Sequence, residues 1–78
     1  MNKKRAIAQL EQARLHSDRG EWTAVEKLTR TVIDAGFREA AGPSLLGEAL
    51  RQLGRRDEAR KVLEAGLAAH PEIGRAHV

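Results

Sequence analysis

The chain has 78 residues and a formal net charge of +3 at pH 7, with no cysteine and two aromatic residues, Trp22 and Phe37. A chain of this length holds one small domain and leaves no room for a large catalytic cleft. The absence of cysteine excludes a disulfide framework, a zinc–thiolate site and a thiol nucleophile, and the scarcity of aromatic residues argues against a base-stacking surface and a β-rich core.

The N-terminal residues do not form a targeting or membrane segment. Residues 3–5 are basic, but Gln9 and Glu11 interrupt the apolar residues that follow, so no apolar run of signal-peptide length results. No stretch approaches the roughly 20 apolar residues that a membrane-spanning helix needs. We therefore expect a soluble, cytoplasmic protein.

The first half of the chain predicts two helices. Residues 3–17 are rich in strong helix formers, and Gly20 suits the left-handed position after a helix end. A second helix is expected from Trp22 to Ala35, where Gly36 stops it, and Trp22 is expected to pack over the turn. Three- and four-residue spacing places its apolar residues on one face: Trp22, Val25, Leu28, Val32 and Ile33.

The second half predicts two more helices. Pro43 has no N–H to donate and fits only a first turn, so the third helix begins near Gly42 and ends at Gly54. Asp57 is expected at the N-cap or first turn of the fourth helix, which closes before Pro71. No segment alternates with period two, so the fold class is all-α. The apolar stripes are Leu45, Leu46, Ala49, Leu50 and Leu53, followed by Ala59, Val62, Leu63, Gly66 and Leu67.

The two halves resemble each other when one is shifted along the other so that Ala6 meets Ala41. In this alignment Ala24 and Ala59 occupy equivalent crossing points between helices, and the helix breaks also coincide. The unit is a helix, a tight turn and a second helix, so the expected architecture is antiparallel hairpins stacked as a short α-solenoid. The identities are Ala6 with Ala41, Leu10 with Leu45, Leu15 with Leu50, Ala24 with Ala59, and Leu28 with Leu63.

The second half is similar to the tetratricopeptide repeat, a helical hairpin of about 34 residues. The resemblance implies one domain, with repeats over about residues 5–38 and 40–73, one extra residue between them, and residues 74–78 opening a third. The first half keeps Leu15, Ala24 and Leu28 but has Glu11 and Gln12 in place of the usual Leu-Gly pair. In the second half the matching residues are Leu46, Gly47, Leu50, Ala59, Leu63, Gly66 and Pro71, and residues 53–59 are typical of the turn.

Helix packing agrees with this pattern. Gly47 and Ala59 are small, as is required where two helices approach closely. Leu46, Leu50 and Leu63 are expected to fill the space that remains between the helices.

An incomplete third repeat leaves the fourth helix partly uncovered at Val62, Leu67 and Ala68. We expect either that the chain is part of a longer array or that self-association through this uncapped helix covers the face. A sufficiently stable monomer is the third possibility.

The sequence contains no convincing catalytic constellation. His16, Ser17 and Asp18 are the residue types of a hydrolase triad, but adjacent helical side chains point about 100° apart and cannot converge. The three histidines lack zinc-ligand spacing, and no glycine-rich phosphate loop is present. We expect no catalytic residue, no metal, no cofactor and no enzyme activity in this chain.

The resemblance implies a concave groove lined by the first helix of each repeat. This polar face would hold an extended peptide, with Arg51 and Arg75 placed to pair with a carboxylate. The lysine and asparagine set of chaperone-binding family members is absent, so we do not expect a chaperone clamp. The positions that match the groove are Gln9, Ala13, His16, Ser17, Ser44, Glu48, Arg51, Gln52 and Arg75.

The leading interpretation is a protein–protein interaction scaffold that binds a peptide or protein partner through the concave helical face. One alternative is a small basic nucleic-acid-binding domain, in which residues 45–69 form a helix-turn-helix. Another is the N-terminal repeat region of a larger enzyme. Stacking of hairpins explains the internal repeat, whereas binding in the major groove of DNA does not explain it. This difference favours the scaffold. The nucleic-acid alternative relies on Arg55, Arg56, Arg60 and Lys61.

Overall fold

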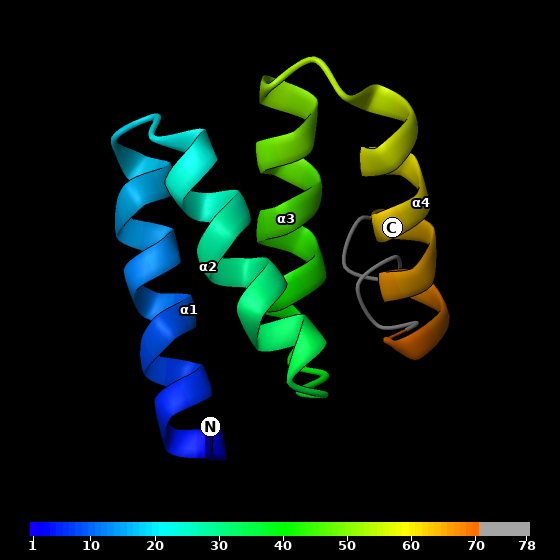
Figure 1. Ribbon diagram of the computed structural model, residues 1–78. Coiled ribbons are helices and arrows are strands. Elements are labelled where there is room, and N and C mark those ends of the chain that lie inside the picture. The colour runs from blue at the N-terminus through cyan, green and yellow to red at the C-terminus, as the bar shows by residue number, and fades with distance from the viewer. Residues whose placement is uncertain (71–78) are drawn as a thin grey trace.

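The computed structural model describes residues 1–70, which form four antiparallel α-helices and no strand (Figure 1). Each helix packs against the next along the chain, and α1 also contacts α3. The all-α prediction is confirmed, and the helices begin and end close to the expected positions. Their bounds are α1, Lys3–Asp18; α2, Trp22–Asp34; α3, Ala41–Gln52; and α4, Arg56–Ala69.

The two hairpin turns have the same geometry. Gly20, between α1 and α2, has a φ of 72°, and Gly54, between α3 and α4, has a φ of 83°. Side chains with a Cβ are strained in this left-handed region, which is why glycine occupies both positions. The same backbone bond closes each turn: Glu21 N to His16 O at 2.9 Å, and Arg55 N to Leu50 O at 2.8 Å. We call the alignment of the hairpins that pairs Gly20 with Gly54 the glycine register.

The glycine register corrects the alignment that pairs Ala24 with Ala59. The counterpart of Ala59, which is 3% exposed, is Val25, which is 0% exposed. Ala24 is only partly buried and lies one position away from the equivalent site. The first hairpin places a larger residue at this crossing than the second does, so matching alanine to alanine shifted the first repeat by one position.

The core is continuous across both hairpins because α2 and α3 each contribute to more than one cluster. Trp22 packs against the middle cluster, and its Nε1 would lie 4.0 Å from a Cβ on Gly20, so it also reaches the turn as predicted. Phe37, in the connector between α2 and α3, packs against the first cluster. The clusters are Ala6, Leu10 and Val32; Ala13, Val25 and Ala49; and Leu46, Leu50 and Ala59.

Two glycines allow α3 and α4 to approach closely. A Cβ placed on Gly47 would lie 2.6 Å from Cγ of Leu63, and one placed on Gly66 would lie 2.7 Å from Cβ of Pro43. The prediction that Gly47 is small because two helices meet there is confirmed. Gly66 is the more restrictive position, because the proline ring is fixed to the backbone of α3 and cannot turn aside.

The apolar stripe of α4 is only partly buried. Leu63 lies against Gly47 as expected, but it is 39% exposed, and Leu67 is 41% exposed. Leu63 therefore fills the space between α3 and α4 only in part, and Val62 and Gly66 complete that interface. Among residues 1–70 no helix packs on the outer side of α4, where Leu63 and Leu67 remain accessible.

A ring of four alternating charges joins α2 to the start of α4. Glu26 accepts hydrogen bonds from Arg30 Nε at 3.0 Å and from Arg55 Nη1 at 2.7 Å. Glu58 accepts from Arg30 Nη2 at 3.1 Å and from Arg55 Nη2 at 2.8 Å. Hydrogen bonding by Arg55 lowers the pKa of Glu58. Within the described residues α2 and α4 have no close backbone contact, so this charge ring links them directly.

The close approach at Gly66 predicts a strong effect of one added methyl group. We expect Gly66→Ala to lower the free energy of unfolding by about 1–3 kcal/mol through overpacking, although alanine favours helix by about 1 kcal/mol. Gly42→Ala is the matched control, because its Cβ would meet Ile33 Cγ1 at an ordinary 3.4 Å. Denaturation followed by circular dichroism measures both variants. Equal loss of stability in the two would contradict the close approach of α4 to Pro43.

The charge ring predicts a specific sensitivity to acid. The lowered pKa of Glu58 in the folded chain means that its stabilisation is complete above the unfolded pKa, about 4.3. The stabilisation is lost as pH falls through the folded value. Glu58→Gln should therefore melt with a shallower pH dependence below about pH 4.3 than the wild type. Glu11→Gln, which removes an exposed carboxylate of α1 outside the ring, is the control and should not reproduce the effect. Identical profiles for the two variants would exclude a contribution of the ring.

Candidate partner-binding face

The adjoining sides of α1 and α3 form a surface that we call the α1–α3 face. A hollow of about 270 Å³ lies on it, with an apolar floor and a charged rim. Ile7 is half-exposed in this hollow, so it offers apolar contact area that no described residue covers. The lining residues are Ile7, Leu10, Glu11, Arg14, Glu39, Ala41 and Leu45.

The two helices contribute equivalent positions to the α1–α3 face. Ile7, Glu11 and Arg14 follow one another at steps of four and three residues, which returns them to the same side of α1. In the glycine register, Ile7 corresponds to Ala41 and Glu11 to Leu45, and all four line the hollow. The face is therefore a repeated feature of the two hairpins.

The structure places Gln9 and Ala13 away from this hollow. Ala13 has no exposed surface and belongs to the core cluster shared with Val25 and Ala49, so its side chain is not accessible to a partner. Gln9 faces the neighbouring helix, where its Nε2 donates to the carbonyl of Leu28 at 3.1 Å. Gln9 thus joins α1 to α2.

His16 and Ser17 belong to the first turn. The Nδ1 atom of His16 lies 2.7 Å from Oε1 of Glu21. The carbonyl of Ser17 accepts a hydrogen bond from Gly20 N at 3.0 Å. Both residues are partly buried, and these contacts hold the turn between α1 and α2.

The predicted residues on α3 remain at the surface, and three of them form one polar cluster. Arg51 Nη2 donates to Glu48 Oε2 at 2.9 Å, and Gln52 Nε2 donates to Glu48 Oε1 at 3.0 Å. Hydrogen bonding by Arg51 and then Gln52 lowers the pKa of Glu48. Arg51, the predicted carboxylate-binding residue, thus has an internal carboxylate partner. Ser44 is exposed, and Arg75 lies outside the described residues.

A second apolar hollow, of about 460 Å³, lies on the outer side of α4. Arg51 of α3 stands at its edge, while Arg60 and Glu64 lie one helical turn apart beside the leucines. We call this surface the α4 outer face. It contains Leu63 and Leu67, the exposed leucines of α4. Its main lining residues are Arg51, Arg56, Arg60, Leu63, Glu64 and Leu67.

The arginines proposed for nucleic-acid binding are not equivalent in the structure. Arg55 is held in the charge ring by Glu26 and Glu58, so its charge is balanced within the chain. Arg56, Arg60 and Lys61 are exposed. Within the described range, no helix is both long and apolar enough to cross a membrane, and no three potential metal ligands are grouped together.

Arg14 was missed because the predicted alignment placed the first hairpin one position away from the glycine register, in which Arg14 corresponds to Glu48. Ile7 and Glu11 correspond to Ala41 and Leu45, which the sequence pattern did not place in the groove. The signal that identifies the shift is the pair of turn glycines, Gly20 and Gly54, which share a positive φ. A turn requires its glycine at one position, whereas small residues on a helix face recur often and align by chance.

Comparison with known protein families gives a match in the second half of the chain. Residues 44–78 match the tetratricopeptide repeat family, and this segment includes most of α3 and all of α4. No curated protein and no solved structure matches the chain. The first hairpin repeats the turn geometry of the second in the glycine register. The chain therefore carries a tetratricopeptide repeat in its second hairpin, and its four helices are consistent with about two repeats of that family.

Proposed function

We propose that this chain is a scaffold module that binds a peptide segment of a partner protein on the α1–α3 face. The tetratricopeptide repeat at residues 44–78 implies a protein–protein interaction module in general, and such repeats are typically not catalytic. The observation that supports this face is the apolar hollow to which α1 and α3 contribute equivalent positions.

The α1–α3 face provides two kinds of contact. The half-exposed Ile7 beside Leu45 can receive an apolar side chain of the partner. Arg14 is exposed, and among the described residues no ion pair engages it. Its guanidinium can therefore take a carboxylate without displacing another one. Farther along α3, a partner carboxylate would compete with Glu48 for Arg51.

We expect peptides selected from a random displayed library on the intact chain to shift the amide NMR signals of Ile7, Arg14 and Leu45. Arg14→Glu should weaken these peptides about tenfold or more, because it removes a charge-assisted hydrogen bond. Arg51→Ala should lower the affinity of those selected peptides that contain a second acidic residue.

Arg5→Glu is the matched control for Arg14→Glu, since it makes the same charge change on α1 at a residue that does not line the hollow. It should leave affinity unchanged. If none of the selected peptides shifts the amide signals of Ile7 and Leu45, the α1–α3 face is excluded as the binding site.

We further propose that the α4 outer face associates with a second copy of the chain. Leu63 and Leu67 supply exposed apolar surface. Arg60 and Glu64 also lie on this face. When two such helices pack antiparallel about a two-fold axis that passes near Val62, Arg60 of each copy comes opposite Glu64 of the other. The surface is therefore complementary to itself, as a two-fold interface must be.

This association predicts an effect of charge at one leucine. Leu67→Glu should abolish the concentration-dependent increase in mass that we expect for the wild type in analytical ultracentrifugation, because it buries an unpaired carboxylate between the copies. Leu15→Glu is the control, since Leu15 is also an exposed leucine but lies on α1. A wild-type chain that stays monomeric at all concentrations would contradict the proposal.

A further inference from the structure

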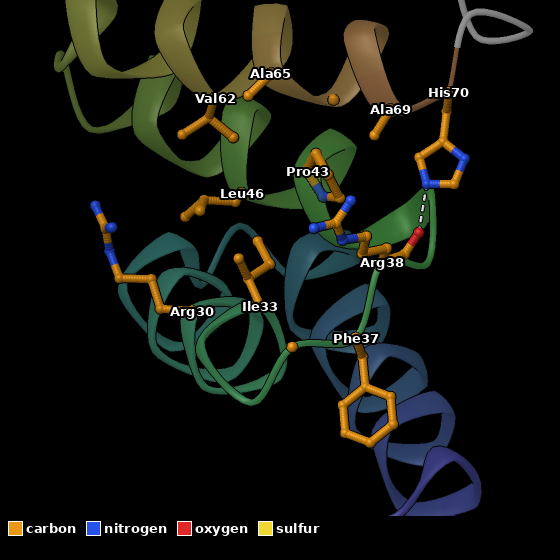
Figure 2. A pocket seen from close by; sticks show the side chains of 12 residues that line it. Arg30, Ile33, Phe37, Arg38, Pro43, Leu46, Val62, Ala65, Ala69 and His70 are labelled. Carbon is orange, nitrogen blue, oxygen red and sulfur yellow. Dashed lines mark hydrogen bonds between the residues drawn. The ribbon is translucent and has the colours of Figure 1, made fainter.

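A third hollow lies on a different side of the molecule, between α2 and α4, and we call it the α2–α4 groove (Figure 2). It has a volume of about 470 Å³, within the range of roughly 300–1,000 Å³ that is usual for binding pockets. Pro43 and Leu46 of α3 form its floor. Ile33 stands on the α2 side, and Val62 stands on the α4 side.

The groove is open because the residues along its α4 wall are small. Ala65, Gly66 and Ala69 line the α4 wall of the groove. None of these residues has a side chain long enough to reach α2. Phe37, the largest residue nearby, does not fill the space. Its ring points away in Figure 2 and packs against the cluster of Ala6, Leu10 and Val32.

Two polar contacts connect the sides of the groove. At one end, Arg30 of α2 is bound to Glu58 of α4 within the charge ring. At the other end, a ring nitrogen of His70 hydrogen-bonds the carbonyl of Arg38, which ties the end of α4 to the connector before α3 (Figure 2). A site held in this way loses little conformational entropy when a ligand enters.

Among the residues that the structure describes, those lining the groove carry positive charge and no negative charge. No acidic residue lines it, and the guanidinium of Arg38 makes no hydrogen bond or ion pair within the described range. Figure 2 shows the Arg38 side chain extending back over the groove toward Pro43. Arg30, by contrast, is already bonded to two carboxylates. Arg38 is therefore the cation available to an incoming anion.

We propose that the α2–α4 groove binds a peptide segment in which one or two large apolar side chains stand next to a carboxylate. The apolar side chains lie over Leu46 between Ile33 and Val62, and the carboxylate pairs with Arg38. A guanidinium binds a carboxylate through two parallel hydrogen bonds, which would fix the direction of the peptide along the groove. This site is separate from the α1–α3 face and does not depend on it.

The test uses the intact chain and a random displayed peptide library. We expect a class of selected peptides with an acidic residue beside apolar ones, which shifts the amide signals of Ile33, Val62 and Ala69 but not those of Ile7 and Leu45. Ala65→Glu places a negative charge on the α4 wall, and Arg38→Glu reverses the cation. Each should weaken this class about tenfold or more.

Ala68→Glu is the matched control for Ala65→Glu, because it makes the same change at an exposed alanine of the same helix. It should leave the affinity unchanged. A peptide with lysine in place of its acidic residue should bind Arg38→Glu more tightly than it binds the wild type. Circular dichroism must show that each variant is folded.

Three outcomes would overturn the proposal. The first is a library that yields no peptide shifting the signals of Ile33 and Val62. The second is a set of groove-binding peptides whose affinity is indifferent to Arg38→Glu. The third is loss of self-association in Ala65→Glu, which would assign the groove to a second copy of the chain. None of these outcomes bears on peptides that bind the α1–α3 face.

Discussion

The close packing of α3 between α2 and α4 is the constraint on which the rest of the structure depends. Gly42 lies against Ile33 of α2, and Gly47 and Gly66 bring α3 and α4 together. A helical hairpin cannot bury its apolar side alone, so two hairpins become one domain only where a shared helix fits closely to both neighbours. Because α3 lies deep between α2 and α4, these two helices do not meet, and the α2–α4 groove remains above it.

The positions of the charges matter more to partner choice than their sum. The chain has a formal net charge of +3, but Arg30, Arg51 and Arg55 are paired with glutamates in the structure. Arg14 and Arg38 are without such pairing among the described residues, and they lie on the two different surfaces that we propose for peptide binding, each beside apolar side chains. Both surfaces therefore offer one available cation next to apolar area, a combination that suits acidic and apolar peptides better than the regular phosphates of a nucleic acid.

The sequence predicted the helices and turns well because they depend on local chemistry. Pro43 can begin a helix but not continue it, and Gly20 permits the left-handed backbone of the turn. The predicted binding positions on α3 are at the surface, whereas Ala13 on α1 is buried, because the alignment matched alanines instead of turn glycines. The charge ring could not be foreseen, since it joins residues of different hairpins, and their separation in space depends on how deeply α3 packs. The α2–α4 groove was missed for the same reason. A row of small residues predicts close packing, but within the row of Ala65, Gly66 and Ala69 it is Gly66 that meets Pro43, whereas Ala65 and Ala69 line open space.

The glycine register also shows how the charges at corresponding positions of α2 and α4 differ. Glu26, Arg30 and Ile33 of α2 meet the second hairpin through the charge ring and through Gly42. Their counterparts on α4 are Arg60, Glu64 and Leu67, so the apolar position is kept while the order of charges is reversed. Suppose that another hairpin docked on α4 as the second hairpin docks on α2. To pair with Arg60 and Glu64, it would need an acidic residue at the position that corresponds to Arg55 and a basic residue at the position that corresponds to Glu58. The second hairpin of another copy lacks this order, whereas an antiparallel α4 would supply it if the two-fold axis passed near residue 62, where each Arg60 would face Glu64 of the other copy. The reversal of charge therefore supports the two-fold contact that we propose over continued stacking of the same hairpin.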